Sequence, residues 1–234
     1  MSPTPIDDRP IGPALPDWQP PPKPEPRPML GRTCRLEPLS AAHHAAALFE
    51  QIHNDDAPES WTYLAYGPFV SAAEYRDWIA RAEASMDPLF FAIVDSESGD
   101  PIGVASYLRI DPGNGVIEIG HLYFTRRLQR TPAATEAIAM MMRCVFELGY
   151  RRCEWKCDAL NAASRRAAKR LGFQFEGIFR QAVVYNGRSR DTAWFSVIDS
   201  EWPPLDRALH TWLTVDNFDD LGRQRQPLSD FMPS

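Results

Sequence analysis

The order of apolar and polar residues along the chain predicts strands and helices in an alternating series. A two-residue alternation or a short continuous apolar run is typical of a strand, whereas apolar residues repeating every three or four positions are typical of a helix. On this basis the sequence predicts strands over residues 33–39, 89–94, 102–110, 116–124, 152–159, 173–185 and 191–198.

Capping residues and helix stops delimit the predicted helices. Ser71 and Glu74 have the spacing of a capping box, and Asp87-Pro88 ends the helix that they begin. Pro132 suits the first turn of a later helix, and Gly149 follows its end. The predicted helices span residues 40–53, 71–86, 132–148, 162–171 and 205–213.

This order of elements predicts an α+β fold. Antiparallel strands come first, a β-α-β crossover follows, and Asn186-Gly187 marks a hairpin. We therefore expect a mixed, mostly antiparallel sheet of six to seven strands with helices on both faces. Residues 1–29 hold eleven of the 22 prolines and predict an extended or disordered arm, residues 30–202 form the domain, and residues 203–234 add a helix and tail.

Composition narrows the function classes. The formal net charge is −6, which argues against a general nucleic-acid binder, and no apolar run is long enough to predict a membrane span. The proline-broken start has no signal-peptide pattern, so we expect a cytoplasmic protein. Cys153 and Cys157 lack a second ligand pair at zinc spacing, so we expect no metal and treat the cysteines as reduced, packed thiols.

Two segments carry candidate chemistry. Arg126, Arg127 and Arg130 lie in a loop directly before the helix that opens at Pro132, and a helix N-terminus beside such cations suits a pyrophosphate. A solvated loop is the alternative. Asn161 and Ser164 open the next helix, where Asn161 serves either as a ligand contact or as an ordinary cap.

Together these segments resemble the GNAT acetyltransferase superfamily, closest to its Rim-type branch, whose named members acetylate ribosomal-protein N-termini. The resemblance covers about Arg32 to Trp202. It implies a GNAT fold with splayed central strands, and transfer of an acetyl group from acetyl-CoA to a primary amine. The segments that carry it are Ile119-Gly120-His121, Ala134-Thr-Glu-Ala137, Leu148-Gly-Tyr150, Asn161-x-x-Ser164, Leu171-Gly-Phe173, Glu176-Gly177 and Asp191 with the strand after it.

The resemblance also implies a set of acetyl-CoA contacts. The family's pyrophosphate loop, of form Gln/Arg-x-x-Gly-x-Gly/Ala, matches Gln129 to Ala134, but Pro132 replaces the central glycine and supplies no N–H. The strand before the loop is expected to pair with the pantetheine arm. The implied contacts are Leu122, Tyr123, Phe124, Gln129, Arg130, Thr131, Ala133, Ala134, Thr135, Asn161 and Ser164.

Three residues are candidates for proton transfer. Glu118 is the preferred base because apolar neighbours raise a carboxyl pKa, although a glutamate that faces solvent or an arginine is equally compatible with the pattern. His121 is a second base candidate, or a packing residue. The tyrosine that many GNAT enzymes use to protonate the thiolate is absent, since Ala168 stands at its position, and Ser164 is the replacement expected.

The acceptor amine is expected between an aromatic loop and the last hairpin. Trp61 and Tyr63 on the loop, and Arg190 and Asp191 on the hairpin, are the predicted substrate contacts. A small molecule, a peptide N-terminus or a lysine would each fit this description. Two alternatives stay open, namely a CoA-binding sensor with little catalysis and the use of another donor such as succinyl-CoA. A homodimer is also expected.

Overall fold

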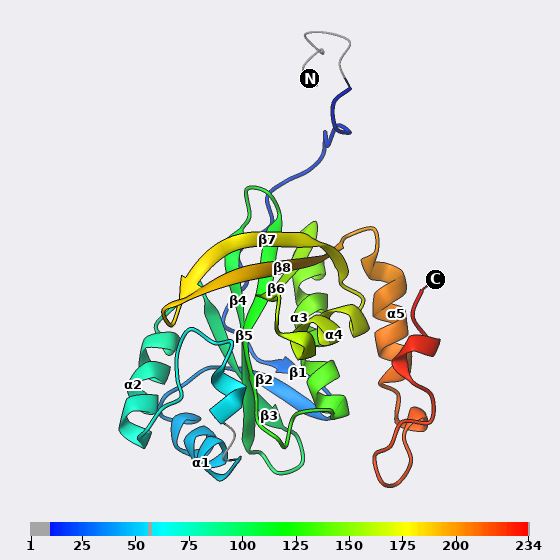
Figure 1. The fold of residues 1–234 in the computed structure, drawn as a ribbon. Coiled ribbons are helices and arrows are strands. Elements are labelled where there is room, and N and C mark those ends of the chain that lie inside the picture. Colours follow the sequence, from blue (N-terminus) through cyan, green and yellow to red (C-terminus); the bar gives the residue numbers. More distant parts are fainter. Residues whose placement is uncertain (1–9, 56–57, 234) are drawn as a thin grey trace.

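A single sheet organises the domain in the computed structural model, which describes residues 10–55 and 58–233. Within those residues the sheet has eight strands in the order β1-β2-β3-β4-β5-β6-β8-β7, and every neighbouring pair is antiparallel except β5 and β6 (Figure 1). The elements are β1 (Met29–Leu30), β2 (Cys34–Pro38), α1 (Ala45–Asp55), α2 (Ala72–Glu83), β3 (Leu89–Asp95), β4 (Pro101–Asp111), β5 (Val116–Phe124), α3 (Pro132–Glu147), β6 (Arg152–Asp158), α4 (Ala162–Arg170), β7 (Gln174–Tyr185), β8 (Arg188–Ile198) and α5 (Trp202–Trp212).

The predicted α+β class and the mixed, mostly antiparallel sheet are confirmed. The strand count is one higher than the upper prediction because β1, at the end of the proline-rich segment, pairs with β2 through Met29 and Leu36. Two residues are too few to show an alternation, so the sequence pattern does not reveal this strand.

Helix starts follow local hydrogen bonding. Ser71 accepts a hydrogen bond from the Glu74 N–H at 3.1 Å and begins α2, as predicted. The prediction that Ser40 starts α1 is wrong, because the helix begins at Ala45. The His44 ring accepts the Ser40 N–H at 3.0 Å, which closes a turn ahead of the helix.

Each face of the sheet has its own core. The larger core lies under α3 and α5 and includes Ile117, Ile119, Met141 and Phe195. The smaller core lies under α1 and α2 and includes Leu48, Ile79 and Trp61. Because β5 contributes Ile119 to one core and Tyr123 to the other, it is the strand around which both layers pack.

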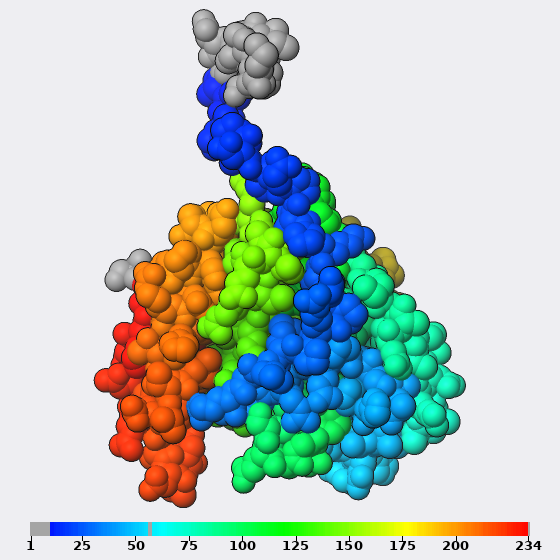
Figure 2. Space-filling model, turned by 180° about the vertical axis from the view of Figure 1, so that it is seen from behind, coloured from blue at the N-terminus to red at the C-terminus, as the bar shows by residue number. Residues whose placement is uncertain are grey.

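The chain on either side of the sheet also contacts the domain. Helix α5 begins at Trp202 and buries Leu205, Leu209 and Trp212 in the larger core. Figure 2 shows the arm running down the back of the domain beside α3, where Pro21 and Pro24 are buried. Residues 1–9 of the predicted arm lie outside the described residues. Among the helices of the described chain, none is long and apolar enough to cross a membrane.

Candidate active site

The central strands β5 and β6 separate after a short parallel contact. They pair only over Val116–Glu118 and 152–154 within the described chain. A bulge in β5 marks the separation, because Ser106 pairs with Gly120 while Val104 pairs with Tyr123. His121, inside the bulge, has a φ of +51°. Beyond Glu118, the edge of β5 that faces β6 is therefore not paired with that strand. This separation is the splay that the resemblance implies.

The three residues predicted along the pantetheine arm have packed side chains. Tyr123 is buried and stacks on Trp61 with ring centroids 4.2 Å apart. Leu122 and Phe124 are half-buried against the larger core. Their backbone groups, rather than their side chains, are what this strand offers to a ligand.

The loop between β5 and α3 is held by its own side chains. Gln129 donates its side-chain amide N–H to the Phe124 carbonyl at 2.8 Å. Thr131 caps α3, because its hydroxyl accepts the Ala134 N–H at 3.3 Å and donates to the Leu128 carbonyl at 2.7 Å. Thr135 is buried, and its hydroxyl accepts a hydrogen bond from Arg170 at 2.8 Å.

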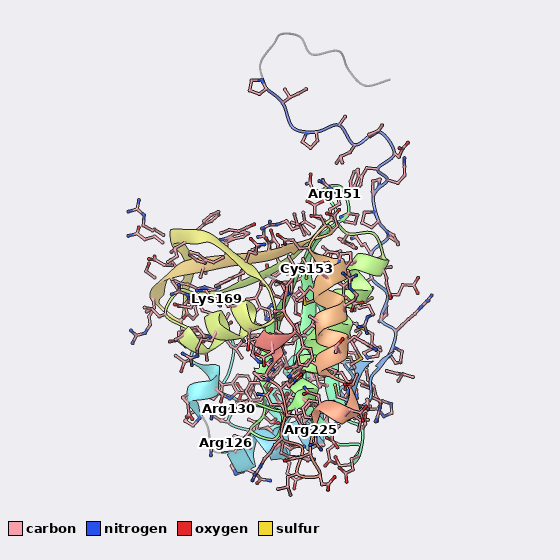
Figure 3. The ribbon with its side chains drawn as sticks, turned by 90° about the vertical axis from the view of Figure 1, so that its right-hand side faces the viewer. Arg126, Arg130, Arg151, Cys153, Lys169 and Arg225 are labelled. Carbon is pink, nitrogen blue, oxygen red and sulfur yellow. The ribbon has the colours of Figure 1, made fainter. Side chains whose placement is uncertain are left out.

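The loop arginines differ in how far they are committed to partners. Arg127 forms an ion pair with Asp100 at 2.7 Å, and the Arg126 guanidinium lies 3.9 Å from Glu59. Arg130 has a φ of +63° and, among the described residues, no ion pair. Figure 3 labels Arg126 and Arg130 at the lower end of the domain.

A diphosphate fits this loop. The first turn of α3 leaves the Ala133 N–H without an intrahelical partner, and its dipole favours an anion. Arg130 adds a cation, and the small, half-buried side chain of Ala134 permits close approach. Pro132 withholds one N–H, as the sequence indicates.

The helix after β6 places a hydroxyl beside two buried side chains. Asn161 caps α4, because its side-chain oxygen Oδ1 accepts the Ser164 N–H at 3.0 Å. The cap interpretation therefore holds for this oxygen. The Ser164 hydroxyl accepts the Trp155 indole N–H at 2.9 Å. Burial raises the pKa of the Cys157 thiol, and the neighbouring Ser164 hydroxyl opposes that shift. Ser164 still has its own O–H to donate.

Glu118 is a buried carboxylate on the opposite face of β5 from Ile117 and Ile119. Its residue is 5% exposed. Burial raises the pKa of Glu118, and the nearby Lys156 ammonium, 3.0 Å from Oε2, opposes this shift. The Arg109 Nε lies 3.5 Å from the same oxygen. The solvent-facing interpretation of Glu118 is therefore wrong, and the arginine that the sequence allows for is accompanied by a lysine.

His121 is held among aromatic rings. Its ring stacks on Tyr66 with centroids 5.6 Å apart and lies tilted against Phe90 at 5.3 Å. Burial lowers the pKa of His121, so the neutral imidazole is favoured at pH 7. These contacts account for the residue as a packing side chain within the bulge.

The predicted acceptor contacts divide into buried and accessible groups. Trp61 is 4% exposed and packs inside the smaller core, where Tyr66 and Phe69 meet its edges. Tyr63 lies at the surface of the loop and donates to the Leu160 carbonyl at 3.3 Å. This bond links the aromatic loop to the segment between β6 and α4.

On the hairpin, Asp191 accepts a hydrogen bond, whereas Arg190 forms none with its side chain among the described residues. Asp191 accepts the Gln181 N–H at 2.7 Å, which supports a bulge in β7. The Arg190 guanidinium lies 5.8 Å from the Tyr185 ring centroid, and its Nε is buried without a hydrogen-bond partner in the described structure.

Sequence reasoning did not single out Asp158 and Lys156, two polar residues of β6 that lie on the same face of the strand as Glu154. Asp158 is 5% exposed and accepts the Tyr185 hydroxyl at 2.8 Å and the Leu160 N–H at 2.8 Å. Lys156 lies one side-chain repeat earlier on the same face of the strand. The alternation in Cys153 to Asp158 was the available signal, since it places Glu154, Lys156 and Asp158 opposite the apolar face.

Comparisons with known proteins agree with this geometry. The family model described as an acetyltransferase (GNAT) domain matches residues 34–174. A crystal structure of a GCN5-related N-acetyltransferase from Brucella melitensis is 51% identical, with a TM-score of 0.91, and the match covers 93% of this chain and 99% of that one.

Two curated bacterial proteins are also similar. A Bacillus licheniformis protein named uncharacterized N-acetyltransferase p20 is 30% identical over 149 residues, which is 62% of this chain and 83% of that protein. YdaF of Bacillus subtilis, whose name places it among ribosomal N-acetyltransferases, is 27% identical over 172 residues, which is 71% of this chain and 90% of that protein.

The sheet of the described residues, which opens between β5 and β6 beside the N-terminus of α3, and the matching family model define an acetyltransferase of the GNAT class. The chain belongs to the GNAT acetyltransferase family, and its similarity to YdaF supports the Rim-type branch. The general reaction of the family is acyl transfer that depends on acetyl-CoA, so the chain is an acyl-CoA-dependent N-acetyltransferase.

Proposed function

We propose that the chain transfers the acetyl group to a primary amine by direct attack, with Glu118 as the general base. The observation that carries the proposal is the position of Glu118, a buried carboxylate at the last paired position before β5 and β6 separate. A carboxylate with a raised pKa accepts a proton from an ammonium more readily than an ordinary glutamate does.

The donor side of the site is built from the loop, β5 and α4. The Ala133 N–H and Arg130 would hold the diphosphate, and the edge of β5 that β6 leaves uncovered from Leu122 to Phe124 would hold the pantetheine arm. Asn161 keeps its side-chain NH₂ for an amide carbonyl, because only its oxygen serves the helix cap. Bound acetyl-CoA supplies the acyl carbon as a thioester.

The acceptor side of the site is built from the face that carries Glu118. Tyr63 donates to the Leu160 carbonyl. Asp158 accepts both the Leu160 N–H and the Tyr185 hydroxyl. Arg190 contributes a cation beside Tyr185. We propose that these groups orient the acceptor, with Asp158 and Glu118 favouring a cationic amine.

Two protons leave the amine nitrogen. Glu118 takes the first from the bound ammonium, which frees the nitrogen lone pair to attack the thioester carbon. As the carbon–nitrogen bond forms and the carbon–sulfur bond breaks, the second proton passes to the departing sulfur, so that CoA leaves as a thiol. The Ser164 hydroxyl donates a hydrogen bond to the departing sulfur, and its own oxygen stays held by Trp155. The developing negative charge on the carbonyl oxygen requires a donor, and we propose that a backbone N–H of the β5 bulge supplies it.

Release of free CoA thiol from acetyl-CoA tests this proposal. A panel of amino acids, peptides with free N-termini, polyamines and lysine derivatives would be screened with the wild-type chain and with Glu118→Gln. We expect at least one amine to release CoA, and Glu118→Gln to lower kcat/KM by about 10²-fold or more. Equal rates in both proteins would remove Glu118 as the base.

The acceptor class, the oligomeric state and the location are also proposals. The name of YdaF favours a protein N-terminus as one acceptor to test.

A homodimer is supported by the edge strand β7, where Phe179 is 57% and Val184 81% exposed. A cytoplasmic location is supported by Cys34, Cys144, Cys153 and Cys157, which are all free thiols. Light scattering of the purified protein tests the dimer.

A further inference from the structure

Lys156 is a buried lysine that touches two carboxylates and an aromatic ring. Its side chain is 7% exposed, and Nζ lies 3.0 Å from Glu118 Oε2 and 2.8 Å from Glu154 Oε2. The same nitrogen lies 3.7 Å from the centroid of the Trp194 ring. Within the described structure Nζ and the two Oε2 atoms have no hydrogen-bond partner, so Lys156 is held by charge attraction and by the ring face rather than by hydrogen bonds.

The two carboxylates do not depend equally on Lys156. Glu154 has a second cation, because Arg152 Nε lies 2.9 Å from its Oε1. Arg152 is in turn bound by Glu176 at 2.5 Å. Glu118 has only Arg109 besides Lys156 within salt-bridge distance among the described residues, and the Arg109 side chain is 60% exposed at 3.5 Å. Lys156 is therefore the closest and most buried cation beside Glu118.

We propose that Lys156 is a positioning residue for acetyl transfer, which fixes the orientation of the Glu118 carboxylate and favours its ionised form, while Glu154 limits this effect by sharing the ammonium. The inference rests on the proposed function, in which Glu118 is the base. Lys156 is not proposed to contact the substrate, and its charge acts through Glu118.

This arrangement predicts opposite responses to two substitutions. The charged groups that face Glu118 are Lys156 and Glu154 from β6 and Arg109 from β4, with Arg152 and Glu176 acting through Glu154. Lys156→Met removes the opposing charge and makes the Glu118 carboxylate harder to ionise. Glu154→Gln removes a like charge and leaves Lys156 to Glu118 alone, which makes ionisation easier.

The titration midpoint of Glu118 can be measured by nuclear magnetic resonance on the full chain, without any acceptor amine. The chain is labelled with ¹³C at the glutamate side-chain carboxyl. Glu118→Gln assigns the Glu118 signal. Relative to wild type, we expect the Glu118 midpoint to rise by about 1–3 pH units in Lys156→Met and to fall in Glu154→Gln. Lys156→Arg should stay near wild type. Lys23→Met, which removes an exposed lysine of the arm, is the matched control.

The outcomes separate this inference from the proposed function. An unchanged Glu118 midpoint in folded Lys156→Met, or a rise in Glu154→Gln, overturns the role of Lys156. If Lys156→Met does not fold, as judged by circular dichroism, the Glu154→Gln titration decides alone. Full activity of Glu118→Gln would instead overturn the base assignment, because the titration can show the Lys156 effect whether or not Glu118 takes the substrate proton.

Discussion

The Trp155 indole N–H donates a hydrogen bond to the Ser164 hydroxyl oxygen at 2.9 Å. Trp155 is buried in β6, and Ser164 lies in the first turn of α4, so the bond joins the strand to the helix. Because the indole can only donate, it occupies a lone pair of Ser164 and leaves the hydroxyl hydrogen for another acceptor. This geometry is compatible with the role proposed for Ser164, which is to donate a hydrogen bond to the departing sulfur.

Substitutions at this pair should be coupled. Ser164→Ala leaves the buried Trp155 N–H without a partner, at a cost of about 1–3 kcal/mol in the free energy of unfolding. In the Trp155→Phe background the same change should cost about 1 kcal/mol less, because no donor remains. Urea unfolding of the four proteins measures this coupling energy. Additive losses would show that the bond contributes nothing to stability.

The pH dependence of catalysis should report Glu118. Because burial raises its pKa above the ordinary 4.5, the carboxylate form is lost at a higher pH than for an exposed glutamate. The proposed base works only when ionised, so kcat/KM should fall as the pH decreases through that raised value. Glu118→Gln should remove this limb of the profile. Circular dichroism at each pH checks that the fold persists.

The local pattern of the sequence predicts the strands well and the site only in part. Asn186-Gly187 predicts the β7–β8 hairpin, and both residues have the positive φ that such a turn requires, 48° and 69°. The alternation from Val116 to Phe124 predicts β5 to the residue. These features depend on residues that are close together in the sequence, so the sequence pattern can predict them.

Long-range contacts set what the sequence could not predict. The sequence predicts that Lys156 lies in a strand, but its ion pair with Glu118 depends on the parallel register of β5 and β6. Trp61 was expected to face the acceptor because it lies on an aromatic loop. The structure instead buries it against Tyr123, a contact across 62 positions that no local pattern shows.

Glu136 should be among the most important residues for stability. Its carboxylate accepts the backbone N–H groups of Arg32 at 2.8 Å, Thr33 at 2.6 Å and Cys34 at 3.1 Å, and also the Thr33 hydroxyl. It thereby ties β2 to α3, directly behind the proposed diphosphate loop. Glu136→Gln places an NH₂ against these donors and should cost about 2–3 kcal/mol.

Chemical denaturation of Glu136→Gln measures that loss. Glu147→Gln, at the other end of the same helix, is the matched control and should unfold within about 0.5 kcal/mol of wild type, as exposed substitutions usually do. Equal stability of the two variants would contradict the role given to Glu136.

Arg130 should affect affinity and stability in different directions. Its φ of +63° is costly for an arginine and natural for glycine, so Arg130→Gly should leave the free energy of unfolding unchanged or raise it by up to about 1 kcal/mol. The same change removes a cation from the loop and should weaken acetyl-CoA binding by about tenfold. Arg127→Gly, which breaks the Asp100 ion pair, is the comparison and should affect binding less.

Calorimetric titration of the wild-type chain with acetyl-CoA measures whether the proposed donor site binds its cofactor. We expect saturable uptake of about one equivalent per chain, because the α3 N-terminus, Arg130 and the open edge of β5 are proposed to form one donor site. Weaker uptake by Arg130→Gly would locate that site at the loop. If the folded wild-type protein takes up no acetyl-CoA, the donor site is wrong and the base assignment is lost with it.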